Sequence, residues 1–284
     1  RMSKYEPLIR ETLQQEGLPE DLIYVAMIES GFSTSARSSA GAVGVWQFIA
    51  STGREMGLRI DAYVDERRDP VKATRAAARY LEYLHDKFGS WPLALAGYNG
   101  GPGLVAKVIE KYNSNDYWFI SRHKGMYSQT RRYVPKVLAA GFIAKNADIF
   151  DLDLVEKQAA LDYDVVELPG RTRLSKVGDA IDTDVSTLRD LNPELRRAIT
   201  PPSKEKYALR IPKGKTKQFV RKFDDVDLGG EEEFYEYEVR FGETVRMIGV
   251  RLEVAPRVIR AVNGLEQDER PESGSTVVVP KEAM

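Results

Sequence analysis

The chain contains no cysteine and only two histidines, His85 and His123. The absence of cysteine excludes disulfide bonds, and two isolated histidines provide none of the ligand spacings that are typical of zinc sites. We therefore expect neither a metal ion nor a cofactor. The 284 residues include 42 basic and 43 acidic side chains, and the resulting net charge of −1 does not favour binding to nucleic acid.

Long apolar segments are also absent. No run reaches the length of about 18 apolar residues that a membrane-spanning helix requires. The chain begins Arg1-Met2 and shows no signal peptide. Because such a signal can be removed from a mature protein, its absence says little against export. The length of the chain allows two or three domains.

One acidic residue ends an otherwise apolar helix. Glu29 follows the run 22–28, in which every residue is apolar or aromatic. The segment 18–21, Leu-Pro-Glu-Asp, predicts the start of this helix, and Gly31 predicts its end. Burial and the negative end of the helix dipole would both disfavour the ionised carboxylate. We therefore expect a raised pKa for Glu29, as a general acid needs at neutral pH. An exposed glutamate at a helix end is the alternative.

Residues 38–48 combine two residue types that are typical of sugar-binding clefts. Gly41 and Gly44 allow the backbone to approach a neighbour or a ligand closely. Trp46 and Gln47 supply an aromatic face and an amide, and we place them at the start of a helix. Ordinary packing of a loop against a helix is the alternative.

A second polar pair follows a short predicted helix. Ser90-Trp91-Pro92 is typical of a helix start, and Tyr98 and Asn99 end that helix before the glycine-rich turn 100–103. This turn lacks the Lys-Ser/Thr pair of a phosphate-binding loop. A polar pair at a helix end could form a cleft wall, and a plain turn between two helices is equally compatible with the sequence.

Taken together, these motifs resemble the lytic transglycosylases of the goose-type lysozyme superfamily, and most closely the membrane-bound lytic transglycosylase D type. The matching segments, in this order, are Glu29-Ser30, Gly44-Val45-Trp46-Gln47, Val64–Pro70, Tyr98-Asn99 and Gln129–Val134. The resemblance covers roughly residues 4–150. It implies cleavage of the β-1,4 bond between N-acetylmuramic acid and N-acetylglucosamine in peptidoglycan without addition of water, leaving a 1,6-anhydro end.

The resemblance also implies roles for individual residues. Glu29 would act as acid and then as base, which departs from the carboxylate pair of most glycosidases. Ser30 would support Glu29 or contact an acetamido group. The remaining predicted substrate-binding residues are Gln47 and Asn99 for sugar polar groups, Tyr98 and Tyr133 for the cleft near the acid, and Trp46, which packs beneath the site or contacts the sugar. Tyr133 could equally belong to the core of the last helix.

A second carboxylate near Glu29 would change the reaction. The nearest acidic residues in the sequence are Asp61, Asp65, Glu66 and Asp69. Arg67 and Arg68 lie among them, which favours a salt-bridged surface turn and a helix cap. If one of these acids faced Glu29, a hydrolytic muramidase would be favoured. A non-catalytic scaffold that binds peptidoglycan is a third hypothesis.

The two halves of the chain differ in pattern. Apolar residues recur with helical spacing at 8–13, 22–28, 73–84, 93–98, 104–109 and 133–143. The second half contains a repeat: Tyr163-Asp164-Val165, Asn192 and Pro212 return as Tyr235-Glu236-Tyr237, Asn263 and Pro280, at offsets of 235 − 163 = 72, 263 − 192 = 71 and 280 − 212 = 68. Each copy predicts the order strand, helix, helix, strand.

These copies resemble the LysM module, a small βααβ domain that binds N-acetylglucosamine-containing glycans. We therefore predict a multidomain protein, in which an all-α lysozyme-like catalytic domain precedes two small α+β modules. The predicted bounds are 1–155 for the catalytic domain, 160–214 for a degenerate LysM-like module, 215–232 for a charged linker and 233–284 for a LysM module. The resemblance implies glycan contacts at Gly242, Glu243, Thr244 and Asn263.

The first copy departs from the LysM pattern at 168–173 and carries an insertion at 200–205. These changes leave open whether it binds glycan or serves as a spacer. The resemblance further implies peptidoglycan strands as the partner and a location in the bacterial cell envelope, in the periplasm or at the outer membrane. Any membrane anchor would lie in a segment absent from this chain. We expect a monomer.

Overall fold

The computed structural model describes residues 1–152, 154–202, 206–223, 234–263, 265 and 270–280. The chain forms two compact units. The first comprises residues 1–58 and 67–161, and the second comprises residues 59–66 and 162–284.

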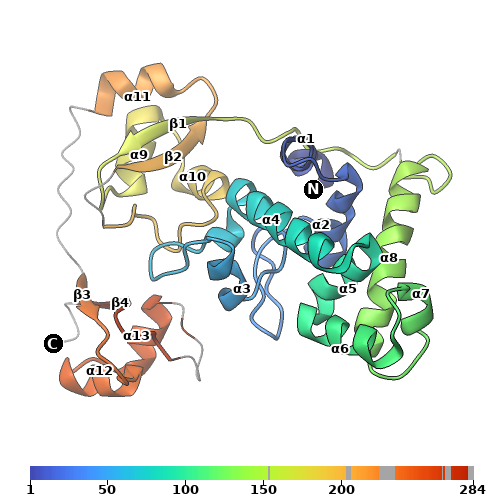
Figure 1. Ribbon diagram of the computed structural model, residues 1–284. Helices are drawn as coiled ribbons and strands as arrows, with labels where there is room; N and C mark the ends of the chain where they lie inside the picture. The colour runs from blue at the N-terminus through green and yellow to red at the C-terminus, as the bar shows by residue number, and fades with distance from the viewer. Residues whose placement is uncertain (153, 203–205, 224–233, 264, 266–269, 281–284) are drawn as a thin grey trace. The chain divides into compact units, whose positions relative to one another are not determined.

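The first unit is helical (Figure 1). Its helices are α1 (Met2–Gln15), α2 (Ile23–Ser30), α3 (Ala50–Glu55), α4 (Pro70–Phe88), α5 (Trp91–Gly100), α6 (Pro102–Tyr112), α7 (Tyr117–Ile120) and α8 (Ser128–Lys145), with 3₁₀ turns η1 (Glu20–Leu22) and η2 (Glu66–Arg68). Every helix that the apolar spacing indicates is present, so the prediction of an all-α first domain is confirmed.

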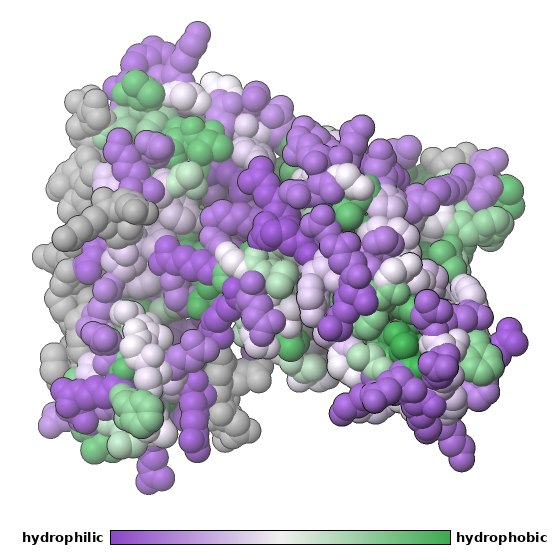
Figure 2. Space-filling model, in the orientation of Figure 1, coloured by the Kyte–Doolittle hydropathy of each residue, from purple (hydrophilic) through white to green (hydrophobic). Residues whose placement is uncertain are grey.

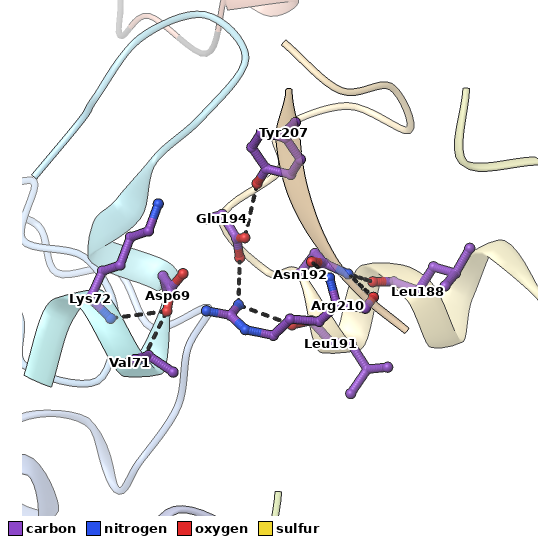
Figure 3. Close-up of polar contacts among 9 residues, drawn as sticks. All are labelled: Asp69, Val71, Lys72, Leu188, Leu191, Asn192, Glu194, Tyr207 and Arg210. Carbon is purple, nitrogen blue, oxygen red and sulfur yellow. Dashed lines mark hydrogen bonds and ion pairs between the residues drawn. The ribbon is translucent and has the colours of Figure 1, made fainter. Parts of the chain in front are cut away.

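Local chemistry fixes the ends of the longest helix, α4. The carboxylate of Asp69 accepts hydrogen bonds from the backbone N–H groups of Val71 at 2.8 Å and Lys72 at 3.1 Å, as Figure 3 shows. Pro70 follows at the first helical position, where its missing N–H is not needed. Gly89 ends the helix in the left-handed conformation, with φ +64°.

Helix α5 lies at the centre of the first unit. It packs against α4, α6 and α8. Residues 93–97 of this helix are all buried, as expected for a helix that is apolar on every side. Small side chains permit the close approach: a Cβ atom added to Gly97 would lie 3.0 Å from the Phe88 ring. This central position holds Tyr98 and Asn99, in the last turn of α5, in a fixed place.

The second unit contains two similar modules. The first consists of β1 (Tyr163–Leu168), α9 (Leu174–Ile181), α10 (Val185–Leu191), β2 (Tyr207–Pro212) and α11 (Thr216–Phe223), and the second of β3 (Phe234–Glu238), α12 (Val245–Arg251), α13 (Pro256–Asn263) and β4 (Thr276–Pro280). In each module the two strands pair antiparallel, β1 with β2 and β3 with β4. The predicted βααβ order is therefore confirmed in both copies.

Two equivalent asparagines explain why the repeat is visible in the sequence. The amide nitrogen of Asn192 donates to the carbonyls of Leu188 and Arg210, and its Oδ1 accepts from the Arg210 N–H (Figure 3). Asn263 makes the same bonds to its own helix and to both backbone groups of Val278. Each carboxamide thus ties the end of the second helix to the last strand, with all three bonds between 2.7 and 2.8 Å.

The predicted linker 215–232 differs from the structure in its first part. Residues 216–223 form helix α11, which packs against α9 and contributes Phe219 to the core of the first module. The carboxylate of Asp164 accepts bonds from Gly214 N–H at 2.9 Å and Thr216 Oγ1 at 2.8 Å, which fixes the start of this helix. Residues 224–233 lie outside the described residues.

A short segment from the first half of the sequence completes the first module. Val64 is buried in its core, and the Asp65 N–H donates to the Glu194 carbonyl at 2.8 Å. The predicted surface turn around these acids is wrong, because Asp65, Glu66, Arg67 and Asp69 are all buried. The predicted helix cap is confirmed at Asp69.

Candidate active site

Glu29 lies in the last turn of α2, as predicted. Gly31 follows it in the left-handed conformation, with φ +57°, and its N–H donates to the Met27 carbonyl at 3.0 Å. The Glu29 side chain is largely withdrawn from solvent, and this burial raises the pKa of its carboxyl group. The prediction of a raised pKa is confirmed, and the alternative of an exposed glutamate is wrong.

Tyr133 is the hydrogen-bond partner of the acid. Its hydroxyl donates to Glu29 Oε1 at 2.5 Å, from the face of α8 that packs against α2. This bond favours the ionised carboxylate and opposes the effect of burial, which is the larger of the two. Burial first, and then the charge of Glu29, hold the pKa of Tyr133 well above its ordinary value. Tyr133 therefore remains a donor, and it is at once a buried residue of α8 and an orienting group for Glu29.

The loop 36–48 is held by hydrogen bonds from two side chains, Ser30 and Tyr98. Ser30 Oγ donates to the Val45 carbonyl at 2.7 Å, and the Tyr98 hydroxyl donates to the Trp46 carbonyl at 2.7 Å. Ser30 Oγ also accepts a bond from the Ser33 N–H at 3.2 Å. With its hydroxyl engaged in these bonds, Ser30 supports the loop next to Glu29, and the predicted contact with an acetamido group has no support.

Gln47 stands in an unusual backbone conformation within this loop. Its φ of +51° lies in the left-handed region, which residues other than glycine rarely occupy. Its amide nitrogen donates to the carbonyls of Gly44 at 2.9 Å and Ala36 at 3.2 Å. Within the described part of the chain Oε1 has no hydrogen-bond partner, so it can accept a bond from a sugar hydroxyl or N–H group. The predicted helix start at this point is wrong, since α3 begins only at Ala50.

Trp46 points into the core. Its side chain is fully buried, and its indole N–H donates to Thr74 Oγ1 at 2.9 Å. Packing beneath the site is therefore confirmed for Trp46, and a direct contact with sugar is wrong.

The side-chain amide of Asn99 is engaged through its oxygen, whereas that of Gln47 is engaged through its nitrogen. The Asn99 Oδ1 accepts a bond from Thr130 Oγ1 at 3.0 Å, which fixes the orientation of the amide. Among the described residues its amide nitrogen has no partner. Among the described residues, Gln47 thus keeps a free acceptor and Asn99 a free donor, and both are groups that can hydrogen-bond to a polar ligand.

Sequence reasoning missed the contribution of Arg67. Its Nη1 donates to the carbonyls of Gly41 at 3.1 Å and Phe48 at 3.2 Å, so one buried guanidinium joins both ends of the loop that carries Gln47. The backbone of Arg67 also packs against Gly44, where an added Cβ would lie 1.8 Å from the Arg67 carbonyl oxygen. The segment 64–70 matches the family pattern, but its mixed acidic and basic residues predict a surface turn, and the sequence therefore gives no indication that Arg67 is buried.

No second carboxylate among the described residues contributes to the pKa of Glu29. That pKa is raised by burial and lowered by the hydrogen bond from Tyr133. Asp69 caps α4, and Asp61 accepts bonds from the N–H groups of Tyr63 and Val64. The described residues also contain no cluster of histidine and acidic side chains that could hold a metal ion, and none of their helices is long and apolar enough to cross a membrane.

In the second module, two of the predicted glycan contacts are internal. The Glu243 carboxylate accepts from the Tyr237 hydroxyl at 2.8 Å and pairs with Arg251 at 3.2 Å. The Asn263 amide is satisfied by backbone groups, as described above. Thr244 caps α12 through a 3.3 Å bond from Met247 N–H. Glu243 and Asn263 are thus structural residues, whereas Gly242 lies exposed in the turn, with φ +73°.

Comparison with known proteins agrees with this geometry. Residues 7–120 match the family model of the transglycosylase SLT domain. The chain carries an SLT domain. Residues 162–227 match the LysM-like domain of the lytic transglycosylase MltD. The prediction of a lytic transglycosylase domain of this type, followed by a LysM-like region, is confirmed.

Several proteins that are similar in sequence or structure to this chain are described as transglycosylases. The chain is 29% identical over 280 residues to the membrane-bound lytic murein transglycosylase D of Escherichia coli K12, covering 93% of this chain and 61% of the relative. It is 34% identical over 143 residues to the peptidoglycan transglycosylase gp16 of Escherichia phage T7, covering 49% of this chain and 11% of that protein. The crystal structure of the 70 kDa soluble lytic transglycosylase of Escherichia coli covers 51% of this chain and 24% of its own, with 24% identity and a TM-score of 0.44. The chain thus spans 61% of the length of the Escherichia coli transglycosylase D.

Proposed function

We propose that the chain is a peptidoglycan lytic transglycosylase, which cleaves the β-1,4 bond between N-acetylmuramic acid and N-acetylglucosamine without water. The observation that carries the proposal is the half-buried carboxyl group of Glu29, whose pKa is raised by burial and whose Oε1 accepts a hydrogen bond from the Tyr133 hydroxyl. The SLT domain match over residues 7–120 supports the same reaction.

The geometry suits a reaction in which one carboxyl group acts twice. Protonated Glu29 gives its proton to the glycosidic oxygen as the bond from that oxygen to C1 of the muramic acid breaks. The carboxylate then takes the proton of the C6 hydroxyl of the same sugar, while the C6 oxygen bonds to C1. The 1,6-anhydro ring forms, the acid regains its proton, and no water enters the product.

Two features support this reaction over hydrolysis. Glycosidases that use water position a second carboxylate near the acid, whereas no carboxylate among the described residues contributes to the raised pKa of Glu29. Tyr133 and the loop held by Ser30 and Tyr98 occupy the surroundings of the acid instead. A hydrolytic muramidase remains the second candidate in the same class, and the identity of the products separates the two.

The direct test is digestion of purified peptidoglycan sacculi, followed by mass spectrometry of the soluble muropeptides. We expect muropeptides with 1,6-anhydro-muramic ends. Reducing ends would identify a hydrolase. If no muropeptide were released while the protein still sedimented with the sacculi, the binding scaffold would replace the enzyme as the proposed function.

Removal of the Tyr133 hydroxyl is expected to change the pH dependence of cleavage. In Tyr133→Phe the bond that favours the ionised carboxylate is lost, so burial acts alone and the pKa of Glu29 rises further. The falling limb of kcat/KM, which reports loss of the acid's proton, should move to higher pH, and the maximum should fall about tenfold. The measurement is a pH profile of muropeptide release.

Tyr117→Phe is the matched control for this profile. Its side chain is equally buried, but its hydroxyl donates to the Arg131 carbonyl of α8 at 2.8 Å and does not contribute to the pKa of Glu29. The control should leave the limb in place. If the falling limb of the kcat/KM profile moved to lower pH in Tyr133→Phe, or moved equally in both variants, the proposed role of the Tyr133 hydroxyl in orienting Glu29 would be contradicted.

The envelope is the proposed place of action, with peptidoglycan strands as the partner of both units. A weak glycan-binding module attached to an enzyme raises the local concentration of that enzyme on an insoluble polymer. In Glu29→Gln, removal of residues 234–284 is expected to lower the fraction that sediments with sacculi several-fold. Unchanged sedimentation would contradict a wall-binding role for the second module.

A further inference from the structure

A row of aromatic rings leads from the acid to the surface of α4. The Tyr98 hydroxyl donates to the Trp46 carbonyl at 2.7 Å, and Ser30, the residue after Glu29, donates to the adjacent Val45 carbonyl at 2.7 Å, so Tyr98 lies near the acid. The Tyr98 ring lies 5.5 Å from the Tyr80 ring, and the Tyr80 ring lies 6.3 Å from the Tyr83 ring, with the last two planes only 16° apart. Three contiguous tyrosines thus connect the buried site with an exposed position.

The outer two rings belong to one face of one helix. Tyr80 and Tyr83 are three residues apart on α4, so their side chains are neighbours on its surface. Tyr83 is 46% exposed. On the visible face of the molecule apolar side chains form small separate patches among hydrophilic ones (Figure 2).

Tyr80 has one free polar group. Its ring packs between Phe48 at 6.2 Å and Tyr98, next to the loop that carries Gln47. Within the described part of the chain its hydroxyl has no hydrogen-bond partner. Burial raises the pKa of Tyr80 to about 12, so this hydroxyl keeps its proton and can donate. An aromatic surface with a free hydroxyl is suited to one face of a pyranose ring and to one of its polar groups.

We propose that Tyr80 and Tyr83 form a distal glycan subsite, which binds a pyranose ring of the same strand that Glu29 cleaves. We infer the ligand from the position of this subsite. Tyr98 lies between the acid and Tyr80, and a glycan strand bound across the acid extends beyond the bond that is cleaved. The charged neighbour of the outer ring, Lys87, lies 5.8 Å from its centre and leaves nearly half of Tyr83 in solvent. The inference rests on the proposed function of the same site.

The test compares uncrosslinked glycan strands of two lengths, the shortest oligosaccharide that is cleaved and a long strand. In Tyr83→Ala the ratio of kcat/KM for the long strand to that for the short one should fall about fivefold or more, as expected for the loss of one stacking contact. Tyr83→Phe retains the ring and should keep most of this ratio. An unchanged ratio in Tyr83→Ala would overturn the proposal.

Phe142→Ala is the matched control. Phe142 is also an exposed aromatic residue, at 62%, but it lies near the end of α8. The neighbouring Gly141 packs against Tyr24 in the first turn of α2, at the end opposite Glu29. The control should keep the wild-type ratio. A similar fall in both variants would indicate a general loss of structure and would overturn the subsite.

A binding measurement separates this inference from the reaction. In the Glu29→Gln background, Tyr83→Ala should weaken the affinity for long strands about fivefold in calorimetric titration. If the wild-type protein formed no 1,6-anhydro ends but this loss of affinity persisted, the proposed reaction would fail and the subsite would stand. If the anhydro ends formed and the affinity were unchanged, the subsite would fail and the reaction would stand.

Discussion

Glu29→Gln is expected to lower the rate of muropeptide release about 10³-fold, because the amide can neither donate the proton to the leaving oxygen nor accept the one from the C6 hydroxyl. The substitution keeps the size of the side chain, and the Tyr133 hydroxyl can still donate to the amide oxygen. The fold should therefore be retained. The measurement is the initial rate of soluble muropeptide release from sacculi, together with the thermal unfolding of both proteins.

Glu16→Gln provides the control for charge alone. Glu16 is exposed at the end of α1, away from the groups that surround the acid. This variant should release muropeptides at the wild-type rate. A Glu29→Gln variant that retained more than about a tenth of the activity would show that another group supplies the proton, and the single-acid account would be wrong.

Gly44→Ala is expected to have the second-largest effect, on both stability and activity. The φ of Gly44 is +84°, and an added Cβ would lie 1.8 Å from the Arg67 carbonyl oxygen, so backbone must move. The left-handed conformation costs about 1 kcal/mol, and the overlap adds about 1–3 kcal/mol of strain. The shift would displace the loop that carries Gln47, so the rate should fall about a hundredfold or more.

The chain contains a matched control for this effect. Gly41 lies in the same loop with φ +76°, but a Cβ atom added there would have no other atom within 4 Å. Gly41→Ala should therefore show only the conformational cost of about 1 kcal/mol. Chemical denaturation and release assays on both variants separate backbone strain from overlap. Equal losses in the two variants would contradict the close packing of Gly44 on Arg67.

Much of this architecture follows from local sequence. Gly31 and Gly89 end helices in the left-handed conformation, and Asp69 and Pro70 begin one. Glu29 is predictable because the run before it is apolar and a glycine stop follows it closely. The repeat is visible because Asn192 and its counterpart make the same three bonds. The helix ends and Glu29 depend on a few neighbouring residues along the chain, whereas the repeat depends on the use of the same residue type for the same set of bonds in both modules.

The remaining features depend on contacts between distant residues. The direction of Trp46 is set by Thr74, which lies 28 positions later, and Ser30 is engaged by a carbonyl 15 positions away. The buried state of Arg67 follows from its bonds to the loop 41–48. No local pattern encodes these pairings, so the charges around Arg67 alone predict a surface turn. Helix α11 is different, because the spacing of Phe219 and Phe223 indicates an apolar helical face.

Cleavage at Glu29 is expected to proceed without water, and this property distinguishes a lytic transglycosylase from a muramidase. Digestion of sacculi in heavy-oxygen water, followed by mass spectrometry of the released muropeptides, tests it most directly. The single-acid reaction predicts 1,6-anhydro ends with no heavy oxygen incorporated. Reducing ends that carry one heavy oxygen atom would show that water attacks C1, and would contradict that reaction.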